Sequence, residues 1–237
     1  AQKDLLIALK KTGKPIVLVN ISGRATVMTW DQENFPAILN VWFGGCESGD
    51  AICDVLFGDK VPSGKLTATM PKSVGQIPLY YNHLNTGRPL KEGKWFTKFT
   101  SNYLDIDNDP LYPFGYGLSY TTFKYGKPTL SSNTMTNNET ISVSVDITNT
   151  GNYDADEIAQ MYIRDLAASV SRPVKELKGF ERISIKKGET KTVTFTITPE
   201  DLKFYNQELE YKNEPGEFEV MVGPNSKDVQ TLTFTLK

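Results

Sequence analysis

Ala37–Leu66 has the sequence AILNVWFGGCESGDAICDVLFGDKVPSGKL, and this stretch decides the fold of the N-terminal part of the chain. It opens with a short run of bulky apolar residues, Ala37–Phe43, which is typical of a strand buried on both faces of a parallel sheet. Two glycines end the run, and an amphipathic helix is predicted over Gly49–Phe57. The order of strand, turn and helix predicts half of a βαβ unit. Ligands of open α/β sheets bind beyond the carboxyl ends of the strands, so the Gly44–Gly49 turn is the first place to look for chemistry.

A second apolar run, Ile16–Ile21, lies upstream and ends at Ser22-Gly23-Arg24. A helical pattern precedes this run and a short helix is predicted within Met28–Pro36, so helices and strands alternate. Because the carboxyl ends of neighbouring parallel strands meet at one edge of a sheet, we expect Arg24 and Glu47 to reach the same crevice. Glu47 also fits a simpler interpretation, that of an acid stabilised by the dipole at a helix N-terminus.

Composition limits the classes of partner. The chain has 237 residues, of which 39% are hydrophobic and 23% charged, as in a globular protein of one or two domains. A net charge of -2 provides no basic surface for nucleic acid or an anionic membrane, and no apolar run approaches the roughly 20 residues of a membrane span. Cys46 and Cys53 are predicted to be free and mostly buried. Two cysteines and one histidine make a metal site a poor hypothesis, and the glycine turn lacks the pattern of a nucleotide-binding loop, so we expect no cofactor.

The C-terminal part has a different pattern. Apolar residues alternate from Thr140 onward, beginning with Ile141, Val143, Val145 and Ile147, and turn sequences separate about seven such segments. This pattern predicts an antiparallel sandwich of the fibronectin type III kind. The fold class is therefore a partial α/β parallel-sheet domain followed by an all-β sandwich.

Between these parts, prolines and glycines are too dense for long helices or strands. We expect three regions, which are the C-terminal part of an α/β sandwich domain at 1–75, an irregular linker at 76–126 and the β-sandwich at 127–237. Alternation at Lys65–Met70 predicts one further edge strand. Within the linker, His83 is the only histidine and Trp95 is a candidate for stacking on a sugar ring, although an ordinary loop histidine and a packed aromatic are the simpler interpretations.

Several motifs together resemble the C-terminal half of glycoside hydrolase family 3, which includes β-glucosidases and β-xylosidases. The motifs that carry the resemblance lie at Gly13–Val19, Trp42–Gly49, Pro62–Leu66, Tyr112–Thr121, Arg172-Pro173 and Glu176–Phe180. They occur in the family's order and extend over the whole chain. Cys46 departs from the family pattern, which usually has glutamine at this position.

The resemblance implies a function and a missing part. Members of the family have an N-terminal barrel with the aspartate nucleophile, and in many of them the acid/base glutamate lies shortly before the helix with which this chain begins. We therefore expect the C-terminal portion of a retaining β-glycosidase, most simply a β-glucosidase that hydrolyses terminal β-D-glucosyl residues. No catalytic residue is expected in this chain, which alone should be inactive.

The same resemblance suggests partners and a location. The expected partners are a β-glycoside substrate and the N-terminal barrel of the same protein. A homodimer is one expected assembly, and the expected location is periplasmic or secreted. Arg24, Glu47, His83 and Trp95 would bind substrate or support the cleft. The alternative is a carbohydrate-binding or structural module with no catalytic role.

Overall fold

The structure is a computed structural model that describes residues 1–90 and 94–237. The chain divides into two compact units. The first, here called the α/β unit, comprises Ala1–Lys60, Thr69–Leu79 and Asp109–Tyr112. The second, here called the sandwich unit, comprises Val61–Ala68, Tyr80–Asn108 and Pro113–Lys237. The predicted fold class, α/β followed by a β-sandwich, is confirmed.

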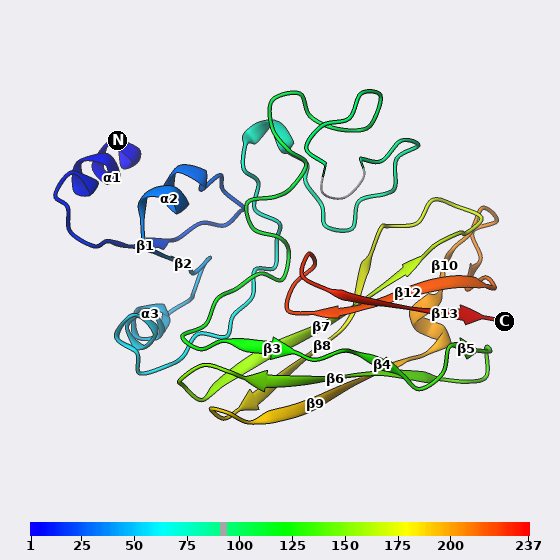
Figure 1. The fold of residues 1–237 in the computed structure, drawn as a ribbon. Helices are drawn as coiled ribbons and strands as arrows, with labels where there is room; N and C mark the ends of the chain where they lie inside the picture. Colours follow the sequence, from blue (N-terminus) through cyan, green and yellow to red (C-terminus); the bar gives the residue numbers. More distant parts are fainter. Residues whose placement is uncertain (91–93) are drawn as a thin grey trace. The chain divides into compact units, whose positions relative to one another are not determined.

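The α/β unit contains one small parallel sheet and short helices. Its elements are α1 (Gln2–Lys10), β1 (Val17–Asn20), α2 (Thr29–Asn34), β2 (Ala37–Asn40), α3 (Ser48–Phe57) and the 3-10 helix η1 (Val74–Gln76) (Figure 1). β1 pairs with β2 in parallel, from Val17 opposite Ala37 to Asn20 opposite Asn40. α3 ends at Gly58, whose φ of 87° lies in the left-handed region that glycine adopts without strain.

Three expectations for this part of the chain are wrong in detail. The strand predicted to reach Phe43 stops at Asn40, and its residues are only partly buried or exposed. The residue two positions further on, Trp42, has a φ of 52°, which is incompatible with a continuing strand. Lys65–Met70 forms no strand, because Met70 makes only an isolated bridge to Tyr112.

The cysteine prediction is half right. Cys46 and Cys53 are both free, as expected, but both are exposed rather than buried. Cys46 lies in the exposed turn before α3. Cys53 lies on α3, a helix that has no buried residue, so being on an amphipathic helix does not bury it.

The described part of the sandwich unit contains two main sheets and a small two-stranded sheet. Its strands are β3 (Phe123–Tyr125), β4 (Thr129–Leu130), β5 (Thr134–Met135), β6 (Ile141–Asn149), β7 (Ala155–Asp165), β8 (Glu176–Ile185), β9 (Thr190–Ile197), β10 (Phe204–Tyr205), β11 (Tyr211–Lys212), β12 (Gly216–Gly223) and β13 (Gln230–Leu236), with the 3-10 helix η2 (Pro199–Leu202). One main sheet has the order β5-β13-β12-β7-β8, the other has the order β3-β6-β4 with β9 paired to β6, and the small sheet is formed by β10 and β11. Alternate residues of β6 are buried, which confirms the predicted alternation.

Irregular segments of the sandwich unit are fixed to it by specific contacts. Tyr81 stacks on Phe114 with ring centroids 4.2 Å apart and meets Tyr162 edge-on at 5.9 Å. Lys65 donates to both carboxylate oxygens of Glu157 at 3.2 Å, and Tyr125 donates to the same carboxylate at 2.9 Å. The segment before the first sandwich strand is therefore held by buried polar contacts as well as by aromatic packing. The division at 75 and 126 stays a prediction.

Candidate functional site

The carboxyl ends of β1 and β2 carry a pair of asparagines. Asn20 and Asn40 are the last residues of their strands and stand opposite each other in the register. The Asn20 Nδ2 donates to Asn40 Oδ1 at 2.7 Å. Asn40 Nδ2 is buried, and no residue in the described part of the chain accepts a hydrogen bond from it. A buried donor of this kind favours a partner that the described residues do not supply, such as a water or another segment of protein.

The turn after β1 brings Arg24 beyond this edge. Ser22 Oγ donates to the carbonyl of Arg24 at 2.9 Å and accepts from its backbone N–H at 3.3 Å, so the turn is locally closed. Gly23 lies against the ring of Phe43, and an added Cβ would lie 2.5 Å from that ring, so a larger residue would require Phe43 to move. Two turns that follow neighbouring strands are therefore in contact.

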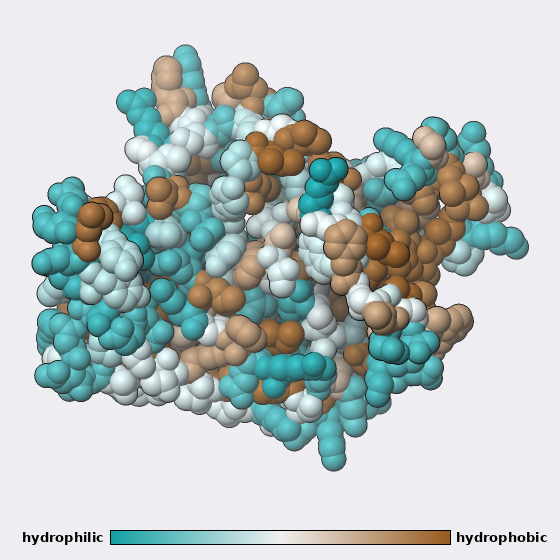
Figure 2. Space-filling view, turned by 180° about the vertical axis from the view of Figure 1, so that it is seen from behind, coloured by the Kyte–Doolittle hydropathy of each residue, from teal (hydrophilic) through white to brown (hydrophobic). Residues whose placement is uncertain are grey.

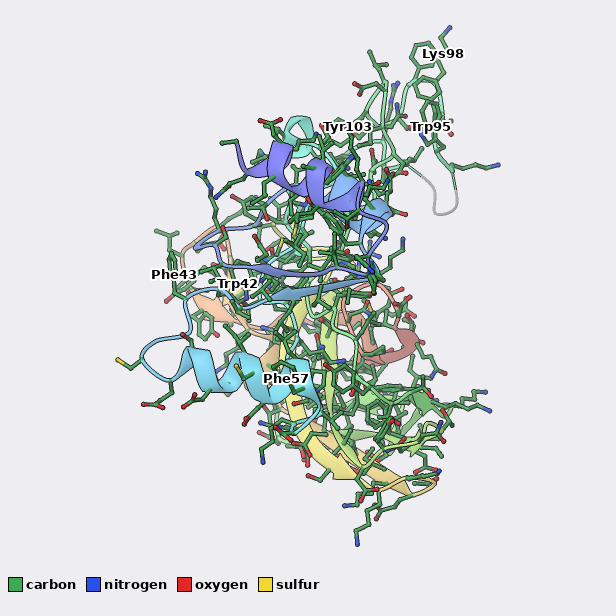
Figure 3. The ribbon with its side chains drawn as sticks, turned by 90° about the vertical axis from the view of Figure 1, so that its left-hand side faces the viewer. Trp42, Phe43, Phe57, Trp95, Lys98 and Tyr103 are labelled. Atoms are coloured by element: carbon green, nitrogen blue, oxygen red, sulfur yellow. The ribbon has the colours of Figure 1, made fainter. Side chains whose placement is uncertain are left out.

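Aromatic side chains follow β2. Trp42 is held at a positive φ, and the next residue, Phe43, is 78% exposed. Figure 3 shows Phe43 directed outward from the α/β unit, with Trp42 nearer its interior. A non-glycine residue at positive φ is uncommon and is a reason to look for function.

Glu47 is the N-cap residue of α3, but its side chain makes no capping hydrogen bond. Both Glu47 and Arg24 are exposed, and no ion pair between them occurs within residues 1–90 and 94–237. Their place after neighbouring strand ends agrees with the expectation from sequence. Their roles stay predictions.

His83 and Trp95 belong to the sandwich unit, whereas Arg24 and Glu47 belong to the α/β unit. His83 Nδ1 lies 3.0 Å from the carbonyl oxygen of Leu84, and the His83 carbonyl accepts from the backbone of Val174 at 3.0 Å. Trp95 is 54% exposed and its ring centroid lies 5.9 Å from that of Phe96. Figure 3 shows Trp95 and Lys98 together near the tip of an extended loop. His83 and Trp95 are both exposed within the sandwich unit and are therefore accessible to a ligand.

Residues 1–90 and 94–237 contain no group of three or more histidine, cysteine, aspartate or glutamate side chains that could hold a metal ion. None of the described helices is long and apolar enough to cross a membrane.

Comparison with known proteins identifies the family. The profile of the glycosyl hydrolase family 3 C-terminal domain matches residues 1–120, and that of the fibronectin type III-like domain matches residues 157–226. This chain belongs to glycoside hydrolase family 3. The resemblance stated from the sequence motifs is confirmed.

Family 3 relatives match the chain along its whole length. A periplasmic beta-glucosidase of Salmonella typhimurium is 54% identical over 236 residues, covering 100% of this chain and 31% of the relative. A beta-xylosidase of Formosa agariphila is 47% identical, with 100% and 32% covered. The crystal structure of a beta-glucosidase from Listeria innocua in complex with glucose superposes with a TM-score of 0.92 at 42% identity, covering 100% of this chain and 33% of that one. The chain thus spans about a third of the length of the relatives it matches.

Sequence reasoning did not single out the Asn20–Asn40 pair of this family 3 chain. A signal was present, because each asparagine is a polar residue that interrupts an otherwise apolar run. Phe43 was also missed as a surface residue, because it was assigned to a buried strand.

Proposed function

We propose that this chain is the C-terminal portion of a retaining β-glycosidase, a β-glucosidase that hydrolyses terminal β-D-glucosyl residues. The observation that carries the proposal is the match over the whole chain to a named beta-glucosidase at 54% identity. A β-xylosidase is the second candidate, favoured by two relatives with that name at 47% and 43% identity. A carbohydrate-binding or structural module without catalysis is the alternative from another class.

The two catalytic carboxyl groups belong, in this proposal, to the barrel and to the loop that in relatives precede the matched third of the protein. A retaining glycosidase uses two carboxyls about 5 Å apart, one as nucleophile and one as acid and base. The strand-end turns of the α/β unit offer one acid, Glu47, and it is exposed. Glu47, Arg24, His83 and Trp95 would then bind substrate or support the cleft.

The surface of the α/β unit supports a role as one part of a larger body. Large apolar side chains are exposed on it, and Figure 2 shows hydrophobic residues, in brown, gathered on its surface. Val17 on β1 is 51% exposed, and Phe57 at the end of α3 is 83% exposed. An apolar groove of about 250 Å3 lies between β2 and α3, lined by Leu39, Ile52 and Val55 among others. Parallel sheets are normally covered on both faces, so the N-terminal polypeptide of the same protein is the proposed cover.

Location and assembly are part of the same proposal. A periplasmic or secreted location is supported by the relative named as a periplasmic enzyme. The homodimer is proposed on the family resemblance alone, and the three regions at 1–75, 76–126 and 127–237 are proposed on the sequence pattern.

The direct test is hydrolysis of an aryl β-glucoside and an aryl β-xyloside by the whole protein and by the 237-residue chain alone. The whole protein should turn over the glucoside faster than the xyloside, and the chain alone should turn over neither. Faster cleavage of the xyloside would favour the second candidate. Turnover by the chain alone would overturn the assignment of both carboxyls to other polypeptide.

The role of Glu47 is tested by E47Q in the whole protein. If it supports the cleft, kcat/KM should fall about tenfold, which corresponds to roughly 1.4 kcal/mol of transition-state stabilisation. E33Q is the matched control, since Glu33 is an exposed acid of α2 in the same unit. Equal activity of the two variants would assign Glu47 a structural role only.

A further inference from the structure

A small hairpin of the sandwich unit presents two tyrosines to solvent. It consists of β10, the turn at residues 206–210 and β11, and it is here called the tyrosine hairpin. Tyr205 and Tyr211 stand opposite each other in the antiparallel register, with ring centroids 5.0 Å apart and planes at 44°. They are 65% and 52% exposed. A touching pair of aromatic rings at the surface is an uncommon use of side chains that usually stabilise a core.

The tyrosine hairpin is firmly attached to the sandwich. Phe204, next to the exposed Tyr205, is only 3% exposed, and the guanidinium of Arg172 lies 4.5 Å from its ring centroid. Asn206 is 4% exposed, and its Oδ1 accepts from the backbone N–H of Glu210 at 2.9 Å. The backbone N–H of Asn206 donates to the Glu210 carbonyl at 3.1 Å. These contacts fix the hairpin backbone that carries the rings before any ligand arrives, which lowers the entropic cost of binding.

The turn also holds an apolar residue in a strained conformation. Leu209 has a φ of 61° and is 80% exposed. The left-handed region is unfavourable for a branched side chain, and glycine or asparagine would occupy it more easily. A strained backbone that places an apolar side chain at the surface points to a function for that side chain there.

Charge narrows the choice of ligand. The segment that carries the hairpin, residues 200–214, is here called its rim and contains five acids, Glu200, Asp201, Glu208, Glu210 and Glu214, against two lysines, Lys203 and Lys212. Both lysines are in ion pairs, Lys212 with Glu210 at 2.7 Å and Lys203 with Glu200. An acid-rich rim with paired cations disfavours nucleic acid, anionic lipid and charged polysaccharide. It suits a neutral ligand that has an apolar face for the rings and hydroxyl groups for the carboxylates.

We propose that the tyrosine hairpin binds a neutral β-linked glucan chain. The sugar rings would stack on Tyr205 and Tyr211, Leu209 would extend the apolar contact, and carboxylates of the rim would accept hydrogen bonds from sugar hydroxyls. The choice of a β-glucan rests on the proposed function, whereas the binding surface itself does not. The site would hold the polymer against the sandwich unit.

The test is affinity electrophoresis of the whole protein in native gels with and without a soluble mixed-linkage β-glucan. The native protein should be retarded by the polymer. The double variant Y205A/Y211A should require about tenfold more glucan for the same retardation, because two stacking contacts are lost. Y153A is the matched control, since Tyr153 is 57% exposed in the same unit and its backbone carbonyl accepts a hydrogen bond from Asn149. This control should bind as the native protein does.

Further measurements keep the outcomes distinct. Hydrolysis of an aryl β-glucoside by the double variant should equal that of the native protein, so a failure of the proposed function would appear in this assay and not in the gel. Y205F/Y211F keeps both rings and should retain binding, which covers the case in which the alanine variant does not fold. Equal retardation of the native protein and Y205A/Y211A would overturn the proposal. Loss of a dimer in Y205A/Y211A, seen by sedimentation without any glucan retardation of the native protein, would assign the hairpin to self-association and also overturn it.

Discussion

The two units use apolar residues in opposite ways. The sandwich unit closes its own core, where side chains from both sheets, such as Ile147, Ile197 and Phe218, are at most 1% exposed. In the described part of the α/β unit, buried apolar side chains are confined to Met28, Phe35, Met70 and Pro71. Its helices α1 and α3 bury no residue. The difference shows that apolar residues mark the faces of helices and strands that can be buried. Burial itself requires a second layer of structure packed against those faces.

The largest expected effect contrasts two phenylalanines. Phe218 is 1% exposed and stacks on Phe234 with centroids 5.5 Å apart, so F218A should lower the free energy of unfolding by about 3–5 kcal/mol. Phe57 is 83% exposed, and F57A in the same 237-residue chain should change it by no more than about 0.5 kcal/mol. Urea unfolding followed by tyrosine fluorescence measures both. A large loss from F57A would show that α3 is covered in this chain after all.

The second comparison concerns a buried ion pair, which the α/β unit lacks among its described residues. The side chains of Lys65 and Glu157 are 12% and 4% exposed. Removing one partner leaves a buried charge, so K65M and E157Q should each cost about 3 kcal/mol. Y125F, which removes one neutral donor to the same carboxylate, should cost about 1 kcal/mol.

A double-mutant cycle separates this pair from general packing. K65M combined with E157L replaces both charges by apolar groups and should recover most of the lost stability, since no unpaired charge remains. Strictly additive losses in the double variant would mean that the ion pair itself carries no coupling energy.

Sequence pattern predicted the sandwich better than the α/β unit for a physical reason. Alternation in β6 identifies the buried face because both sheets of the sandwich lie in this chain. The apolar runs at residues 16–21 and 37–43 predicted two parallel strands correctly, but not their lengths or their exposure. The positive φ of Trp42 ends the second run, and nothing in its amino-acid type announces that conformation.

The positions of the candidate residues could be predicted from the sequence, but their side-chain contacts could not. Arg24 and Glu47 follow neighbouring strand ends, as the βαβ pattern indicated, since that position depends on local order alone. The contact of Phe43 with the turn at Gly23 and the pairing of Asn20 with Asn40 depend on the register between strands. Register is a tertiary property, so a single strand's sequence does not specify it.

Smaller changes in stability, of opposite sign, are expected when the two glycines at the ends of α3 are replaced by alanine. Gly58 has a φ of 87° and open space around an added Cβ, so G58A should cost about 1 kcal/mol through backbone strain alone. Gly49 lies in the first turn at a helical φ, also with open space, so G49A should be neutral or slightly stabilising. Thermal unfolding of the two variants checks the order. Equal losses would indicate that α3 contributes nothing to the cooperative unit of this chain.

The smallest expected effect is a pH dependence that differs in sign between the units. In the sandwich unit, a hydrogen bond from Ser184 and the nearby Arg182, whose Nη2 lies 2.6 Å from the carboxylate, hold the pKa of Asp156 below its ordinary value. In the α/β unit, burial is the main cause that raises the pKa of Asp31. A lowered folded-state pKa gives stability that is present above the unfolded-state pKa and is lost as the pH falls through the folded value. A raised one gives stability that is present at low pH and is lost as the pH rises.

D156N should therefore flatten the loss of stability below about pH 4, whereas D31N should remove a small gain that appears as the pH falls toward about 4. Each change should be under about 1 kcal/mol, because neither carboxyl is deeply buried and solvent screens exposed pairs. Urea midpoints of the two variants and the native chain between pH 3 and 6 provide the measurement. Changes of the same sign in both variants would contradict the comparison, because they would show that a common unfolded-state effect, and not the contrast between a paired and a desolvated carboxylate, governs the acid range.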